Sequence, residues 1–256
     1  MNLLRIELRK ILPYRTAWVI LGIFTGLLLL VLYAASNFSI NGSAIGSDVY
    51  RFPNIWQTIT YVASYFNLLL GILIIVLITD EYTFRTLRQQ VISGLSRADL
   101  VLAKFYVVLG LAAISTLYLL ALGLYFGLLY SSVKTGEAIL GQIDFLSYYF
   151  VQATGYMALA MLSGFLIRKS GLAIIAFIAY AKIVEPLIHY SLPDEVDKYF
   201  PMKVLGSLSP MPGQKLIDQL TSPTELLSPI WATLPAIGYI GLFLLLSYAI
   251  LKLRDL

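Results

Sequence analysis

Three titratable side chains stand close together inside an otherwise apolar stretch, residues 171–190. Lys182, Glu185 and His189 follow one another at helical spacing, so they share one face of the predicted helix. A charge at membrane depth is costly and usually faces protein or a water-filled path. Two interpretations stay open: a gate or path lining for a transported solute, and a structural Lys182–Glu185 pair that holds the bundle together. Pro186 lacks an N–H group and predicts a kink in this helix.

Two amide side chains, Asn67 and Gln152, lie in other apolar stretches. An amide surrounded by lipid needs hydrogen-bond partners. Both are therefore candidates for lining a path, and packing between helices is the alternative.

The residues needed for most catalytic chemistry are missing. The chain has no cysteine and one histidine, which excludes thiolate and multi-histidine metal sites. An intramembrane enzyme would need a histidine-rich motif, a serine–histidine pairing or paired carboxylates in its spans, and none is present. There is no phosphate-binding G-x-x-x-x-G-K-[ST] loop, so ATP, if it is used, must bind to another chain. We expect no catalysis and no cofactor in this chain.

Composition indicates an all-α integral membrane protein. Hydrophobic residues make up 59% of the chain and charged residues 12%. A spanning helix needs about 20 apolar residues. Six stretches qualify within one predicted domain, 1–256: 17–35, 55–79, 100–131, 145–167, 171–190 and 230–252.

The segment between the second and third spans, residues 80–104, predicts a short amphipathic helix over 83–95. Apolar residues recur at helical spacing and arginines fall on the other side, namely Phe84, Leu87, Val91 and Leu95 against Arg85 and Arg88. Gly94 is a natural helix stop. Ser96 and Asp99 form a capping box that starts the next helix.

This segment resembles the first intracellular loop of type-2 ATP-binding-cassette (ABC) transporter permeases, most of all the small six-span permeases of bacteria. The resemblance rests on the T-F-R-T-L-R-Q-Q helix and the following G-L-S-R, with the matching residues Glu81, Phe84, Arg85, Thr86, Arg88, Gln89, Gln90, Gly94, Leu95, Ser96, Arg97 and Lys104. In that family the loop is a coupling helix that sits in a groove of a separate ATPase subunit. The span layout agrees with the resemblance over the whole chain. The resemblance implies no particular substrate.

The resemblance implies the membrane-spanning permease subunit of an ABC transporter, an exporter, with ATP and magnesium on the partner ATPase. Six residues are then expected to dock: Phe84, Arg85, Leu87, Arg88, Val91 and Leu95. A second permease copy or a paralogue completes the expected assembly. The alternative is a secondary transporter or channel that works without an ATPase. Such proteins usually show inverted repeats or several intramembrane charges.

Residues 1–13 predict a basic amphipathic helix lying flat at the membrane surface, ended by Pro13, which corresponds to the elbow helix of that family. A plain charged flank is the alternative. Twelve of the eighteen lysines and arginines gather in four segments, namely 1–16, 80–104, 168–169 and 252–254. Because basic residues mark the cytoplasmic side, we expect both termini there, in a bacterial inner membrane. This sorting also argues against nucleic acid as a partner, whereas membrane lipid is one.

Overall fold

The computed structural model describes residues 3–36, 50–189, 192–214 and 226–254. Within these ranges the chain is helical, and six helices are long and apolar enough to cross a membrane. They are α2 (Arg15–Ser36), α4 (Ile55–Thr83), α6 (Arg97–Tyr130), α8 (Asp144–Ile167), the continuous unit of α9 (Ser170–Ala179), η1 (Tyr180–Val184) and α10 (Glu185–His189), and α14 (Pro229–Leu253). All six predicted spans are therefore present.

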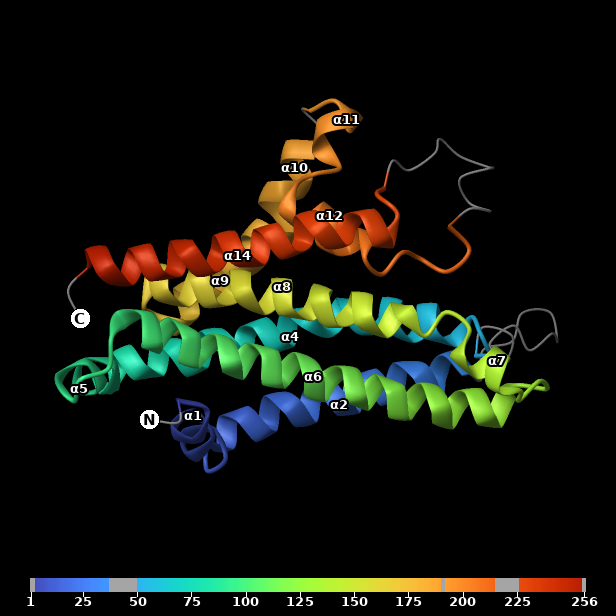
Figure 1. Ribbon diagram of the computed structural model, residues 1–256, viewed down its shortest axis with the longest axis horizontal. Helices are drawn as coiled ribbons and strands as arrows, with labels where there is room; N and C mark the ends of the chain where they lie inside the picture. Colours follow the sequence, from blue (N-terminus) through green and yellow to red (C-terminus); the bar gives the residue numbers. More distant parts are fainter. Residues whose placement is uncertain (1–2, 37–49, 190–191, 215–225, 255–256) are drawn as a thin grey trace.

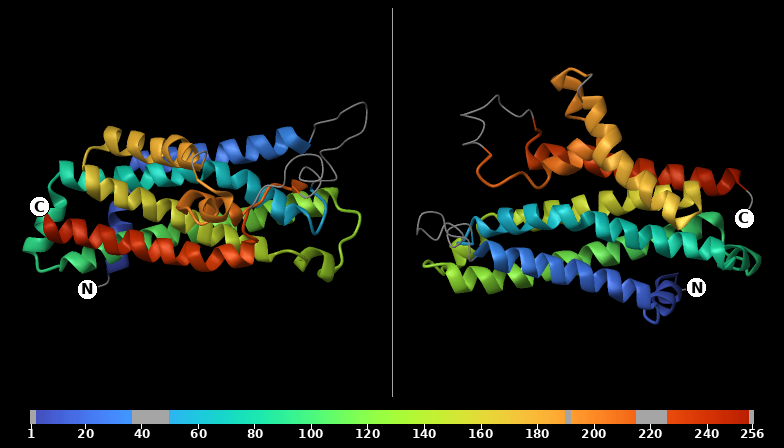
Figure 2. Two further views of the ribbon diagram at one scale, coloured as in Figure 1. Left: turned by 90° about the horizontal axis from the view of Figure 1, so that it is seen from above. Right: turned by 180° about the vertical axis from the view of Figure 1, so that it is seen from behind.

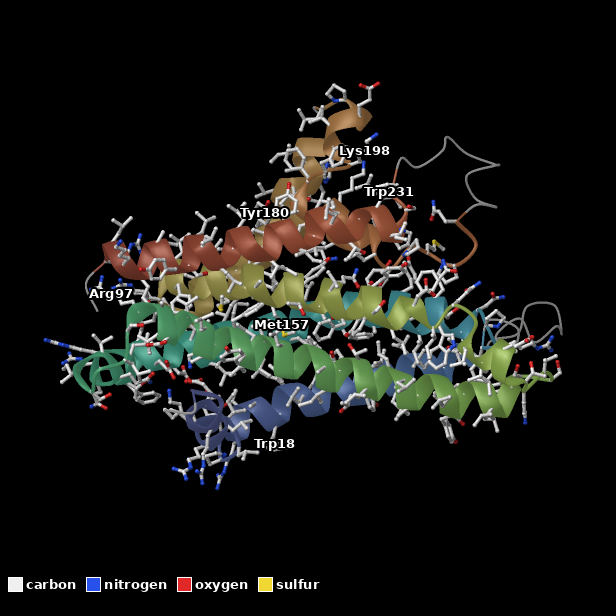
Figure 3. The ribbon with its side chains drawn as sticks, in the orientation of Figure 1. Trp18, Arg97, Met157, Tyr180, Lys198 and Trp231 are labelled. Atoms are coloured by element: carbon white, nitrogen blue, oxygen red, sulfur yellow. The ribbon has the colours of Figure 1, made fainter. Side chains whose placement is uncertain are left out.

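Helix α8 lies at the centre of the bundle and packs against α4, α6, α9 and α14. In Figure 1, α2 lies along one side and α14 along the other, with α4, α6 and α8 between them. Met157, in the middle of α8, has no exposed surface and lies deep among the helices (Figure 3). The apolar core therefore runs along the length of the bundle, as expected for helices that cross a membrane together.

Close approach of α6 to the start of α4 depends on two glycines. A Cβ atom built on Gly123 would lie 2.4 Å from the Trp56 ring, and one on Gly127 would lie 2.3 Å from the Phe52 ring. Both distances are far inside van der Waals contact. These two small residues are thus used for packing within the chain.

Two short elements, α1 and α5, share one end of the bundle. Helix α1 (Leu3–Ile11) stops just before Pro13, as the sequence predicts. Figures 1 and 2 place α1, α5 (Thr86–Ile92), the start of α6 and the end of α14 at the same end, and α7 (Gly136–Leu140) at the opposite end. Arg97 lies at the first of these ends in Figure 3.

The predicted helix over 83–95 is shorter in the structure, where α5 covers seven residues. Helix α4 continues to Thr83, and Arg85 then takes a left-handed conformation with φ 56°, which breaks the helix and turns the chain. The helix end predicted at Gly94 and the helix start predicted at Ser96 are both confirmed. Gly94 has φ +100° after α5, and Ser96 and Asp99 form the capping box of α6.

The fifth span differs from the single kinked helix that the sequence predicts. Residues Tyr180–Val184 form a π-helical turn immediately before Glu185 and Pro186. Beyond it, α10 and α11 (Asp194–Asp197) stand away from the bundle (Figure 1), and α12 (Pro201–Ser207) returns to pack against α8 and α14. We call the α10–α11–α12 segment the hairpin.

Candidate functional site

The connection from α4 to α6 presents an outward face at one end of the bundle. Phe84 and Ile92 are 69% and 77% exposed, which is unusual for side chains of their size outside lipid. Arg85, Arg88 and Gln89 are exposed beside them. An apolar pair bordered by arginines is a suitable surface for another protein.

The apolar face predicted for this segment is split. Leu87 is 1% exposed and Val91 and Leu95 are half-buried, so these three pack on the chain's own core, whereas Phe84 points away. The prediction that all four share one face is wrong because the break at Arg85 rotates Phe84 out of phase with α5. Val91 was expected to be an exposed docking residue, but the exposed side chain is that of its neighbour Ile92, which the helical pattern does not single out.

Four charged side chains form an ionic cluster directly behind this connection, three of them buried and the fourth, Lys10, 33% exposed. Lys104 Nζ lies 2.6 Å from Glu7 Oε2 and 2.6 Å from Glu81 Oε1. Lys10 Nζ lies 2.9 Å from Glu7 Oε1 and 2.7 Å from Glu81 Oε1. We call these residues the elbow cluster. The two ammonium groups balance the two carboxylates and tie α1 to the end of α4 and the start of α6.

Electrostatics favour the charged forms of two cluster residues, Glu7 and Lys10. Burial alone would raise the pKa of the Glu7 carboxyl, but the Lys104 and Lys10 ammonium groups hold that pKa below its usual value. Burial would likewise lower the pKa of Lys10, yet Glu81 and Glu7 raise it above its usual value. Tyr14 extends the contact between α1 and α4 by donating its hydroxyl hydrogen to Asp80.

The elbow cluster also borders the exposed connection. A cavity of about 200 Å³ adjoins it, and Phe84 and Thr86 line that cavity together with all four cluster residues. Glu81 and Lys104 are among the residues through which this segment resembles the permeases, whereas the roles of Glu7 and Lys10 were not predicted. A signal was available, since Lys104 lies inside the apolar run of the third span and needs a carboxylate partner.

A family model described as ABC-2 family transporter protein matches residues 3–183 of the 256. This chain belongs to the ABC-2 transporter family. The match includes α1, the connection with α5 and the whole elbow cluster, so the resemblance of residues 80–104 is confirmed at the level of the family. No curated protein matches the chain. As an ABC-2 family chain with six apolar helices, it is a multi-pass membrane permease.

A second polar cluster holds the hairpin of this ABC-2 family chain together. Glu185 has no exposed surface, and its Oε1 accepts hydrogen bonds from the backbone N–H groups of Met202 at 2.6 Å and Lys203 at 3.1 Å. Pro201 is the first residue of α12, so these two N–H groups have no partner inside the helix. Glu185 of α10 therefore caps α12.

His189 and Asp197 complete this hairpin cluster. His189 Nε2 lies 3.7 Å from Glu185 Oε1, and its Nδ1 lies 3.4 Å from Asp197 Oδ2. Asp197 also pairs with the Lys203 ammonium group. Within the described residues there is no group of three histidines, aspartates or glutamates placed to hold a metal ion.

Lys182 does not pair with Glu185, which corrects the structural interpretation drawn from the sequence. It is exposed, and its Nζ lies 5.8 Å from the centre of the Tyr65 ring. The π-helical turn explains the difference. It places more residues in each turn than an α-helix, so positions three apart no longer share a face.

Asn67 and Gln152 are both buried, and both form hydrogen bonds within the chain. Asn67 Oδ1 accepts a hydrogen bond from the Tyr149 hydroxyl at 3.0 Å. Gln152 donates to the Leu205 carbonyl at 2.8 Å and accepts from the Ser209 hydroxyl at 2.9 Å. Gln152 thus holds the end of α12 and the residues just after it against α8. This geometry favours packing over the lining of an open path.

Replacing Glu185 with glutamine is expected to loosen the hairpin. The amide keeps the size of the side chain but loses the charge that strengthens both N–H contacts, so we expect a destabilisation of about 1–3 kcal/mol. Thermal unfolding of the purified protein in detergent measures it. Glu195→Gln, at an exposed position of α11, is the matched control and should leave the melting temperature unchanged. Altered transport by Glu185→Gln at an unchanged melting temperature would instead support a gate.

Proposed function

We propose that this ABC-2 family permease is an exporter subunit that is energised by a separate ATPase docking on the α4–α6 connection. The observation that carries the proposal is the outward face of that connection, where Phe84, Arg88 and Ile92 are exposed at one end of the bundle. The chain has no phosphate-binding loop, so ATP and magnesium belong on the partner.

The elbow cluster supports a route for the mechanical signal. ATP binding would close the ATPase subunits and push on α5, which follows α4 directly. Since buried ion pairs join the end of α4 to α1 and to the start of α6, these three helices would move together. The hairpin would follow the far part of the fifth span, because Glu185 holds α10 and α12 together.

The distribution of basic residues supports a cytoplasmic location for this end of the bundle. The lysines and arginines predicted to be cytoplasmic lie in or next to α1, α5, the α8–α9 turn and the end of α14. These elements lie together at one end of the bundle (Figure 2). This arrangement supports a bacterial inner-membrane protein with both termini in the cytoplasm. A second permease copy or paralogue would complete the path. Exposed apolar side chains along α9, η1 and α10, such as Ile175, Ile183 and Leu187, suit a partner helix or lipid.

Co-purification tests the proposal. The tagged chain, co-expressed with an ABC ATPase encoded beside it, should bring that ATPase through purification in detergent. ATP hydrolysis by the complex should exceed that of the ATPase alone. If the chain moves solute in proteoliposomes without an ATPase or ATP, it is a secondary transporter or channel and the proposal fails.

A further inference from the structure

A hollow with a basic lining lies beside the exposed connection, at the same end of the bundle. Its volume is about 390 Å³, and it is lined by Glu81, Tyr82, Arg85, Leu87, Arg88 and Arg168. These residues come from two regions far apart in sequence, the end of α4 with α5, and the α8–α9 turn. Three of the six carry a guanidinium group.

Local backbone geometry places two of the arginines. Arg85 and Arg168 both adopt left-handed conformations, with φ 56° and 59°, which are uncommon for residues other than glycine. Arg168 ends α8 in this conformation, with its N–H donating to the Gly164 carbonyl at 3.1 Å. Its guanidinium carbon lies 4.9 Å from the centre of the Tyr82 ring. This cation–π contact holds the guanidinium group at the wall of the hollow.

Positive charge dominates the lining. The acid in it, Glu81, has a side chain that is 8% exposed, and its Oε1 is held by the ammonium groups of Lys10 and Lys104. The charge of Glu81 is therefore balanced by these two lysines, which do not line the hollow. Arg254 adds a further guanidinium nearby, since its Nη1 donates to the Leu166 carbonyl at the end of α8, 2.7 Å away. The hollow is thus suited to an anionic group.

We propose that this hollow seats an aspartate or glutamate side chain of the ATPase subunit. Guanidinium groups bind carboxylates through paired, charge-assisted hydrogen bonds. The hollow is continuous with the outward face of Phe84 and Ile92, because the exposed residues Arg85 and Arg88 belong to both. The inference rests on the proposed function and adds a second contact, the α8–α9 turn. One acidic residue of the ATPase would then act on α4 and α8, the central helix, together.

Affinity measured over a range of salt concentrations tests this site. We expect Arg168→Gln and Arg88→Gln each to weaken ATPase binding about tenfold or more at low salt. Both variants should also show a shallower dependence of affinity on salt, because a screened charge pair has been removed. Arg168→Lys keeps the charge without the fork and should recover part of the loss. Arg9→Gln, an exposed arginine on α1 outside the hollow, is the matched control and should bind normally.

The outcomes separate this inference from the proposed function. If the unaltered chain binds no ATPase, the proposed function itself fails. If the unaltered chain binds and both glutamine variants bind equally well with an unchanged salt dependence, only the carboxylate seat is wrong. A loss of binding to phosphatidylglycerol vesicles at unchanged ATPase affinity also overturns it, and assigns the hollow to a lipid headgroup. Should Arg168→Gln lower the melting temperature, Arg88→Gln, on an exposed side chain, decides alone.

Discussion

Replacing Lys104 with methionine is expected to destabilise the protein by about 3–5 kcal/mol, more than the loss expected for Glu185→Gln. The side chains of Lys104, Glu7 and Glu81 are 5%, 3% and 8% exposed. Methionine fills a similar volume but removes one of the two positive charges from the elbow cluster. Two buried carboxylates are then left with Lys10 alone. The melting temperature in detergent should fall by roughly 10 °C.

Charge balance predicts a partial rescue. Glu7→Gln added to Lys104→Met removes one of the two carboxylates and restores neutrality, so the double variant should be more stable than Lys104→Met alone. Lys169→Met removes a lysine that is exposed at the same end of the bundle, and should change the melting temperature by little. If Lys104→Met and Lys169→Met unfold at the same temperature, the elbow cluster does not stabilise the fold.

Phe84→Asp is expected to prevent assembly with the ATPase while leaving the permease folded. Because Phe84 is largely exposed in the isolated chain, the change should alter the stability of the chain by about 0.5 kcal/mol or less. In a complex, the aspartate would bury a charge in an apolar groove. We expect a loss of about 2–4 kcal/mol of binding free energy, roughly 30- to 1000-fold in Kd, measured on purified components.

Two further variants bracket this result. Ile92→Asp should behave like Phe84→Asp, because Ile92 lies on the same outward face. Val133→Asp, which replaces an exposed apolar side chain beyond α6 near the opposite end of the bundle, should bind the ATPase normally. Normal binding by both Phe84→Asp and Ile92→Asp would remove the α4–α6 connection from the docking surface.

The six spans were predictable because a helix in lipid must be apolar over its whole length, a signal that each segment carries by itself. The capping box at Ser96 and the stop at Gly94 are equally local. The direction in which Phe84 points relative to α5 was not predictable, since nothing in the sequence around Arg85 indicates a left-handed residue. A regular helix over 83–95 would instead point Phe84 and Val91 the same way.

Both polar clusters depend on contacts that no local pattern encodes. Glu7 and Lys104 are 97 positions apart, and a glutamate on an amphipathic surface helix is normally solvent-exposed. Glu185 has backbone N–H groups of α12 as its partners, and backbone donors leave no mark in a sequence. The burial of Glu185 could be predicted from the cost of a charge within the membrane. Its hydrogen-bond partners could be identified only from the structure.

Cross-linking from Ile92 tests the docking claim most directly. The chain has no cysteine, so Ile92→Cys can carry a single thiol-attached photoreactive group. Illumination of the assembled complex should join Ile92→Cys to the ATPase, whereas the same group on Val133→Cys should give no such product. A complex that assembles normally but yields no ATPase adduct from Ile92→Cys, or yields one from Val133→Cys instead, would contradict docking on the α4–α6 connection.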